Sequence, residues 1–233
     1  MPGLFDKSNP KGVYAELSKL EQTLGLRHDF CEDLRMEDDW SFIIKLHALL
    51  EAALTTLIVE TLGKDSLRSI FSEIEMSRDR VGKVAFASAL ELLTDYERRF
   101  IVKLSELRNR LVHNIANVTF NLKAYVDSLE KNQKAAFVHA FSLMNEKDEE
   151  FESMRSYFLN HPKTTLWQVG LLLLSFLSMK TDTARAHREI DATLRDLGDK
   201  HFRDLQASKS ALQRLFEEAS STGQTPEEEG PPT

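Results

Sequence analysis

The sequence predicts an all-α fold, a helical bundle followed by further C-terminal helices. Apolar residues recur at intervals of three and four along most of the 233 residues, which is the period of an amphipathic helix. Chain breakers are few, with nine Gly and six Pro, and the hydrophobic share of 42% is enough for a substantial core. No alternation typical of a strand is longer than the ambiguous one at residues 117–120.

Two helices that end at glycines are expected first. Residues 13–24 carry leucines on one face and are followed by Gly25. The second helix begins near residue 33 or 39, runs to residue 62 and is followed by Gly63. Because this second helix is apolar almost all round, we expect it to be buried at the centre of the bundle.

The middle of the chain is expected to form five shorter helices. The clearest start signal is the capping box Thr94-Asp95-Tyr96-Glu97, in which the first and last side chains can satisfy free backbone N–H groups. Ser77 is the expected N-cap of the helix before it. The predicted helices cover residues 67–74, 77–93, 94–115, 122–129 and 131–144. An acidic link is expected over residues 146–152.

The C-terminal part is expected to contain a strongly apolar helix and then an amphipathic one. Residues 166–179 form the first, with Thr165-Leu166-Trp167-Gln168 as its capping box. From residue 181 onward a narrow apolar stripe lies in polar surroundings, with Gly198 as the expected break. Such a stripe is typical of a helix pair or a dimer arm. The stripe consists of Ile190, Leu194, Leu197, Phe202, Leu205, Leu212, Leu215 and Phe216.

These elements group into four segments. Residues 1–12 are expected to be a flexible N-terminus and residues 13–145 a helical bundle. Residues 146–219 are expected to form C-terminal helices that pack on the bundle or dimerise. Residues 220–233 are rich in Glu and Pro, and their composition predicts a disordered acidic tail.

Composition excludes several classes of protein and site. The formal net charge of −7 argues against a broad basic surface for duplex DNA. Residues 77–115, however, carry eight basic side chains against five acidic ones, which indicates either a phosphate-bearing ligand or solvated helix faces. A single cysteine, Cys31, excludes an intrachain disulfide and a cysteine zinc cluster, and no two histidines are four residues apart. We therefore expect no metal and no cofactor.

The sequence does not predict a membrane protein. The first twelve residues are polar and interrupted by prolines, unlike a secretory leader. The apolar segment 42–62 contains Lys45, His47 and Glu51, and the segment 166–179 is too short to span a bilayer. We therefore expect a cytoplasmic protein without a membrane partner.

The most informative stretch is Arg108-Asn109-Arg110-Leu111-Val112-His113. On a helical wheel Asn109 and His113 lie on one polar face, whereas Arg108 lies at the edge of the apolar stripe. A guanidinium removed from water is costly unless it is paired. Arg108 must therefore pair with a carboxylate inside the domain or face a cleft or subunit interface, while Arg110 is expected to be solvated.

The segment Arg108–His113, with the sequence RNRLVH, lies near the end of a predicted helix. It resembles the arginine-to-histidine motif of HEPN domains. The order of the helices before it, including residues 49–54 and 83–93, resembles the mannitol-operon-repressor-like (MltR-like) branch of that superfamily, over residues 40–120. The resemblance implies a HEPN-like helical bundle and a homodimer that brings the motif helices together. In nuclease members it also implies metal-independent cleavage of RNA.

The resemblance further implies a role for each motif residue. His113 would exchange a proton with the ribose 2′-hydroxyl or the leaving oxygen, Arg108 would stabilise charge on the phosphate, and Asn109 would orient it. Glu51 matches by position the acidic residue that contacts the motif arginine in many members, with His47 beside it. The candidate RNA-binding residues are Arg110, Lys103 and Arg99. The expected partners are RNA and an antitoxin or regulatory protein.

Other interpretations of the same residues stay open. The motif and Glu51 could form a buried polar network that fixes helix register, without any chemistry. The MltR-like branch also includes transcription-associated regulators, so the chain could act through protein contacts, and nucleotide binding is a further alternative. His47 and Glu51 could equally be a local pair on one helix.

Overall fold

The computed structural model describes residues 6, 9, 12–78, 80–144 and 147–221. Within these ranges every regular element is a helix, so the predicted all-α fold is confirmed. The chain divides into two units, Met1–Arg185 and Ala186–Thr233. The elements are α1 (Val13–Thr23), α2 (Phe30–Asp33), η1 (Leu34–Met36), α3 (Asp39–Leu62), α4 (Leu67–Glu73), α5 (Lys83–Ala89), α6 (Asp95–Val112), η2 (Ile115–Thr119), α7 (Leu122–Ser128), α8 (Lys131–Phe141), α9 (Phe151–Asn160) and α10 (Pro162–Ser221).

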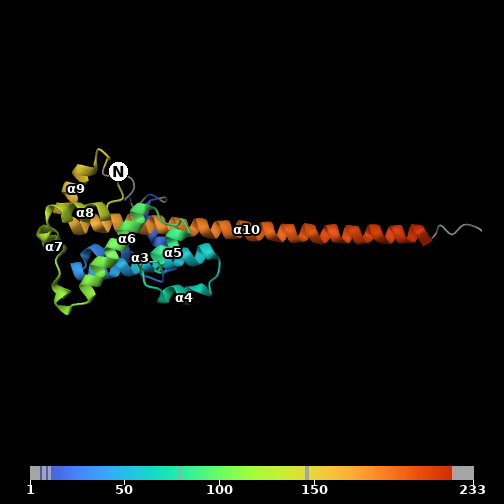
Figure 1. Cartoon of the computed structure of the whole chain (residues 1–233), viewed down its shortest axis with the longest axis horizontal. Coiled ribbons are helices and arrows are strands. Elements are labelled where there is room, and N and C mark those ends of the chain that lie inside the picture. The colour runs from blue at the N-terminus through green and yellow to red at the C-terminus, as the bar shows by residue number, and fades with distance from the viewer. Residues whose placement is uncertain (1–5, 7–8, 10–11, 79, 145–146, 222–233) are drawn as a thin grey trace, which may run out of the picture. The chain divides into compact units, whose positions relative to one another are not determined.

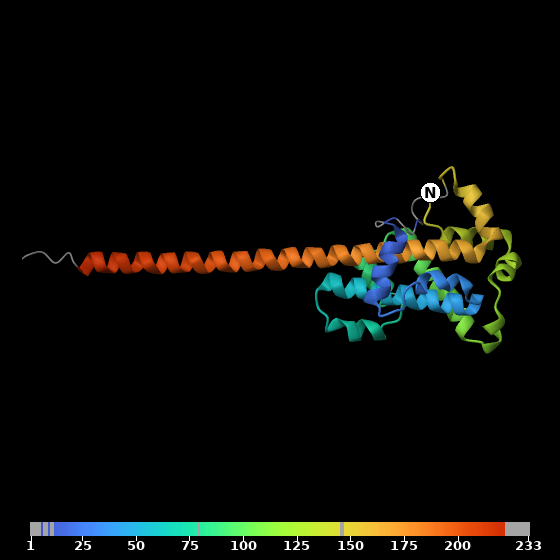
Figure 2. The same ribbon diagram turned by 180° about the vertical axis from the view of Figure 1, so that it is seen from behind.

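α3 is the central helix of the first unit, as its all-round apolarity predicts. Asp38 is its N-cap and accepts a hydrogen bond from the backbone N–H of Ser41 at 2.9 Å. Hydrogen bonds from the hydroxyl and N–H of Ser41 lower the pKa of the Asp38 carboxyl. Gly63 ends the helix in the left-handed conformation, with a φ of 67°. Figures 1 and 2 show α3 running between α4 and the part of α10 that belongs to this unit.

The burial of α3 explains its apolar composition. By length and composition it is the one helix among the described residues that could cross a membrane, yet 72% of its most apolar window is buried inside the protein. α4, α5 and α6 all pack against it. α10 approaches it closely at Gly170, where an added Cβ would lie 3.0 Å from both methyl groups of Leu46. α3 is therefore the core helix of a helical body.

α6 lies antiparallel to α3 and is joined to α10. The indole Nε1 of Trp40, at the start of α3, donates to the carbonyl oxygen of Leu111, at the end of α6, at 3.5 Å. The predicted capping box is present, since Thr94 Oγ1 accepts from the N–H of Glu97 and the Glu97 carboxylate accepts from the N–H of Thr94. Lys180 of α10 lies 2.7 Å from the same carboxylate. Glu97 therefore both caps α6 and connects it to α10.

The prediction of a helix over residues 77–93 is wrong at both ends. Its helical part is α5, Lys83–Ala89, and Ser77 lies outside it. The preceding chain folds back, so that the first two α5 residues donate backbone hydrogen bonds to the carbonyl oxygens of Glu75 and Met76, each at 3.0 Å. Gly82 permits this turn, because a Cβ there would lie 2.6 Å from backbone atoms of the preceding turn.

Two expectations about the start of the C-terminal part are also wrong. Residues 151–160 form the helix α9, so the acidic link expected over residues 146–152 extends two residues too far and the helix itself was not predicted. α10 begins at Pro162 and not at a capping box around Thr165, because proline fits the first helical position, where an N–H has no partner within the helix. The Thr165 hydroxyl instead donates to the carbonyl oxygen of His161 at 3.0 Å.

α10 continues through Gly198, so the expected break there is wrong. A single glycine costs a helix about 1 kcal/mol, which its neighbours can offset. The boundary between the two units falls after Arg185, within α10, so α9 and the first part of α10 belong to the first unit. The expected flexible N-terminus and acidic tail lie outside the described residues, apart from residues 6, 9, 12, 220 and 221.

Candidate functional site

A polar pocket of about 470 Å³ lies in the first unit where α3 and α6 face the chain that follows α4. The wall opposite α6 is made by residues 72–78. The five predicted catalytic and supporting residues all line it: His47, Glu51, Arg108, Asn109 and His113. The sequence therefore identified side chains that the fold brings to one cavity.

The motif side chains differ in exposure as the helical wheel predicts. Arg108 is half-buried, whereas Asn109 and His113 are exposed. Arg108 donates from Nη1 to the side-chain oxygen of Asn109 at 3.0 Å. This bond orients the guanidinium and the amide of neighbouring residues along the pocket wall.

Glu51 pairs with Lys83, contrary to the expectation that it would pair with Arg108. Its Oε1 lies 2.6 Å from Lys83 Nζ, and the lysine side chain is only 2% exposed. A buried ammonium is costly without a counter-ion, so Lys83 takes the carboxylate. Within the part of the chain that the structure describes, Arg108 has no carboxylate within ion-pair distance.

Lys83 is the residue of this site that sequence reasoning missed. It is the first residue of α5 and lies behind Glu51. A signal was available, because Lys83 is the single charged residue between Val81 and Leu90, an otherwise apolar and small-residue stretch. A lone lysine in such a stretch indicates a buried ion pair.

His47 joins α3 to α6 behind the pocket. Its Nε2 lies 3.2 Å from the hydroxyl oxygen of Ser105, and that hydroxyl donates its hydrogen to the carbonyl oxygen of Ile101 at 2.9 Å. Nε2 therefore carries the ring proton and donates it to Ser105. Its Nδ1 lies 3.9 Å from Glu51 Oε2.

The protonation of His47 follows from its surroundings. Burial lowers the pKa of its imidazole to about 4, the Glu51 carboxylate opposes this shift, and the Arg108 and Lys83 charges add to it. The ring is therefore neutral at pH 7. In this state it serves as a hydrogen-bonded link between two helices.

His113 is positioned by the end of α6. It is the C-cap, and its N–H donates to the carbonyl oxygen of Asn109 at 3.3 Å. The 3-10 helix η2 follows directly, so the ambiguous segment at its end is not a strand. The side chain of Asn117, in η2, donates to the carbonyl oxygen of Arg110 at 2.9 Å. This bond ties η2 back to the last turn of α6.

The three candidate RNA-binding side chains do not line the pocket. Arg110 stacks on the ring of Tyr125, 5.3 Å from its centroid, and donates to its hydroxyl at 3.0 Å, so it is not simply solvated. Lys103 forms an ion pair one turn along the surface of α6. Arg99 lies over the ring of Tyr96, 4.8 Å from its centroid. Any contact that Arg110 and Lys103 make with RNA would lie on the surface of α6 outside the cavity, whereas the Nε and Nη2 of Arg99 are buried.

The opposite wall of the pocket has mixed charge. Glu73, Glu75 and Arg78 are exposed there. No cluster of three side chains suited to a metal ion occurs among the described residues. What the pocket does offer is a guanidinium without a carboxylate partner and an accessible imidazole, which together suit an anion that exchanges protons.

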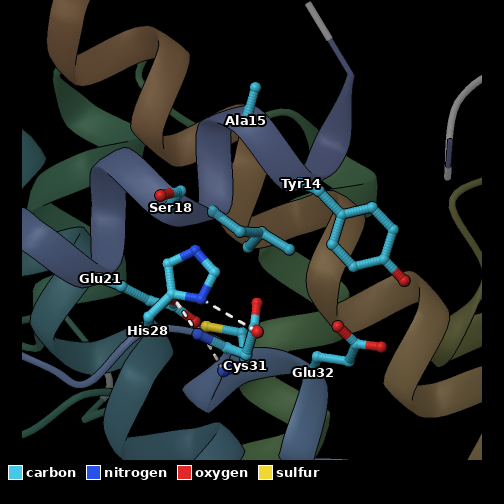
Figure 3. Close-up of a pocket in the computed structure, with 9 residues that line it drawn as sticks. Tyr14, Ala15, Ser18, Glu21, His28, Cys31 and Glu32 are labelled. Atoms are coloured by element: carbon cyan, nitrogen blue, oxygen red, sulfur yellow. Dashed lines mark hydrogen bonds and ion pairs between the residues drawn. The ribbon is translucent and has the colours of Figure 1, made fainter. Parts of the chain in front are cut away.

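A second pocket, of about 220 Å³, surrounds the single cysteine (Figure 3). The buried carboxylate of Glu21, on α1, accepts hydrogen bonds from the backbone N–H groups of Asp29 at 3.0 Å and Cys31 at 2.8 Å. Burial raises the pKa of the Cys31 thiol, and the Glu21 carboxylate adds to this shift. The thiol is therefore protonated and unreactive, and Glu21 fixes the turn between α1 and α2.

Comparison with protein-family models, curated proteins and solved structures finds no match to this chain.

Proposed function

We propose that the chain is a metal-independent endoribonuclease of the HEPN toxin or defence type, and that the pocket between α3 and α6 is its active site. The observation that carries the proposal is the state of Arg108. It is half-buried, it lines a polar pocket, and it has no carboxylate partner among the described residues. A guanidinium in such a place is a ligand for an anion, and each RNA linkage carries a phosphate of matching geometry.

In this proposal His113 transfers the proton. A histidine can accept and release protons near neutral pH, and His113 is exposed at the same pocket. Its imidazole takes the proton of the ribose 2′-hydroxyl, the 2′-oxygen bonds to phosphorus, and the bond from phosphorus to the 5′-oxygen breaks. Arg108 stabilises the negative charge that develops on the phosphate oxygens.

The same step requires an acid for the leaving group. The departing 5′-oxygen takes its proton from water. One product then ends in a 2′,3′-cyclic phosphate and the other begins with a 5′-hydroxyl. Asn109 holds the guanidinium in place, while His47 and Glu51 support the pocket from behind.

The test is cleavage of labelled RNA and tRNA by the purified full chain in EDTA. We expect His113→Ala to lower the rate by roughly 10²–10⁴-fold, the usual contribution of a general acid or base. Arg108→Ala should also abolish cleavage, because it removes the phosphate ligand. His187→Ala is the matched control, since His187 is an exposed histidine in the second unit.

Two outcomes would contradict this function. One is cleavage at equal rates by the wild type and His113→Ala, which would point to a contaminating nuclease. The other is a wild type that cleaves neither total RNA nor tRNA while circular dichroism shows it folded. Products without a 2′,3′-cyclic phosphate would rule out the proposed chemistry even if cleavage occurred.

A second candidate function is that of a non-enzymatic, MltR-like regulator that acts through protein contacts. The row of exposed apolar side chains in the second unit favours it, because such rows mark contact surfaces. In that case Arg108→Ala or Glu51→Ala should lower the melting temperature, His113→Ala should change it little, and no variant should cleave RNA. Either function would be exercised in the cytoplasm, with a protein partner such as an antitoxin, and without a membrane.

A further inference from the structure

The second unit of the chain carries a row of apolar side chains that are open to solvent. Each of them is between 55% and 60% exposed: Ile190, Leu194, Leu197, Leu205, Leu212 and Leu215. On a helix of 3.6 residues per turn they fall within a narrow arc, together with His201 and Ser208. A continuous apolar row on one helix face needs a covering partner.

The spacing of this row is symmetric. Positions 190, 194, 197, 201, 205, 208 and 212 are separated by 4, 3, 4, 4, 3 and 4 residues, a series that reads the same from either end. His201 is its centre. When a second copy is laid antiparallel with the two His201 residues opposite each other, Ile190 lies opposite Leu212, and Leu197 lies opposite Leu205. The same register places Leu194 opposite Ser208 and Leu215 opposite His187. The same positions recur after eleven residues, which keeps the row nearly straight along the helix.

The charged side chains beside the row favour the antiparallel direction. In the centred register Asp191 of one copy lies on the same edge as Lys209 of the other, two residues apart along the axis, or about 3 Å. Asp204 and Lys200 are matched in the same way on the other edge. Both matches occur twice because the arrangement is two-fold.

The parallel direction loses these matches. A parallel pair in register would place Asp191 beside Glu189 of the other copy, so that two carboxylates meet. It would also leave Lys200 without an acidic neighbour on the facing edge, and it would keep a single match, between Lys209 and Asp204 of the other copy. Flanking charges of this kind set partner choice and orientation in helix pairs.

We propose that residues 186–221 pair with the same segment of a second copy, as an antiparallel two-helix coil centred on His201. The two His201 residues form a polar layer among apolar ones, and a polar layer fixes the register at some loss of stability. The pairing does not depend on the proposed nuclease function. Its failure would leave the pocket and its cleavage test unaffected.

Cysteine pairing tests both direction and register. In the full chain with Cys31→Ser, the variants Leu197→Cys and Leu205→Cys should form disulfides efficiently with each other when mixed under a mild oxidant. Each variant alone should form few, whereas His201→Cys should link to itself. Efficient self-linking of Leu197→Cys would overturn the proposal, because only a parallel pair brings that position opposite itself.

Solution mass tests the pairing without new cysteines. The full chain should be a dimer at micromolar concentration by light scattering, and Asp191→Lys should weaken it by about tenfold. Adding Lys209→Asp to that variant should restore the dimer. Ser210→Asp, on the opposite face of the helix, is the control and should change nothing. A monomer at 100-fold higher concentration, or no rescue by the second charge reversal, would overturn the proposal.

Discussion

Glu51 determines which of two cations near the pocket stays available to a ligand. Lys83 is almost fully buried, whereas Arg108 is half-buried and lines the cavity. The Glu51 carboxylate lies with the cation that would be costlier to leave unpaired. Arg108 is thereby left to bind an anion, so a pairing that looks purely structural shapes the chemistry of the site.

The unequal burial of this ion pair predicts unequal costs of breaking it. Glu51→Gln leaves a buried ammonium without its counter-ion and should lower the free energy of unfolding by about 3 kcal/mol. Lys83→Met leaves a carboxylate that is 31% exposed and can be hydrated, and should cost less than about 1 kcal/mol. Urea unfolding of both variants and of the double variant measures the difference.

An exposed ion pair within α6 supplies the control for that experiment. Glu106→Gln breaks the surface pair with Lys103 and should change the stability by less than about 0.5 kcal/mol. A loss from Glu51→Gln no larger than this would show that Lys83 is hydrated in solution.

His47 gives the fold a dependence on pH. Its pKa is about 4 in the folded chain and near 6.5 when unfolded, so between these values only the unfolded state binds the proton. The free energy of unfolding should therefore be highest above about pH 6.5. It should fall by about 3 kcal/mol at most as the pH drops towards 4. Unfolding in urea at a series of pH values tests this, and His47→Gln should flatten that part of the profile. An equal slope in the variant would assign the effect to other groups.

At the scale of elements, two glycines of α10 have opposite surroundings. Gly170 faces Leu46, and an added Cβ would lie 3.0 Å from both of its methyl groups, whereas nothing lies within 4 Å of a Cβ at Gly198. Gly170→Ala should therefore lower the melting temperature through overpacking. Gly198→Ala should stabilise the helix by about 1 kcal/mol. Hydrogen exchange of amides near residue 198 should slow accordingly. Faster exchange there would mean that the glycine is needed for a bend.

Helices with strong end signals were predictable, and those without were not. α3 and α6 begin and end within a few residues of the predicted positions, because an N-cap, a capping box and a left-handed glycine act through neighbouring residues. α5 was predicted too long. Its start depends on the close approach of the backbone to itself at Gly82, which the helix propensities of neighbouring residues do not predict. α9 was missed: the expected acidic link covered only its first two residues, and no helix was predicted over residues 153–160.

At the scale of the whole molecule, the candidate site was predictable in its residues but not in its pairing. Helical periodicity placed Asn109 and His113 on one accessible face, and the spacing of His47 and Glu51 placed both on one side of α3. The choice of ion-pair partners depends on how deeply each side chain is buried between three helices. A helical wheel describes one helix and does not contain this information. The far wall of the pocket, residues 72–78, carried no signal at all because it is an irregular segment for most of its length.

The change of pattern along α10 was visible in the sequence, but its meaning was not. The leucine-rich residues 166–179 lie in the first unit, and the narrow stripe after residue 186 lies in the second. Sequence periodicity expresses this as a wide apolar face followed by a narrow one. Periodicity alone does not predict that the two faces belong to one continuous helix. When only neighbouring residues are considered, Gly198 is a plausible end of a helix.

The position of His113 couples the proposed reaction to a local opening equilibrium. The residue lies one position beyond α6, held by a backbone hydrogen bond to Asn109 and by the link from Asn117 to Arg110. Ends of helices open more readily than the body of a fold. The imidazole is in place only while this last turn is closed, so catalytic competence would be lost on warming before the core α3 unfolds. A single helix end would then set the working temperature range of the protein.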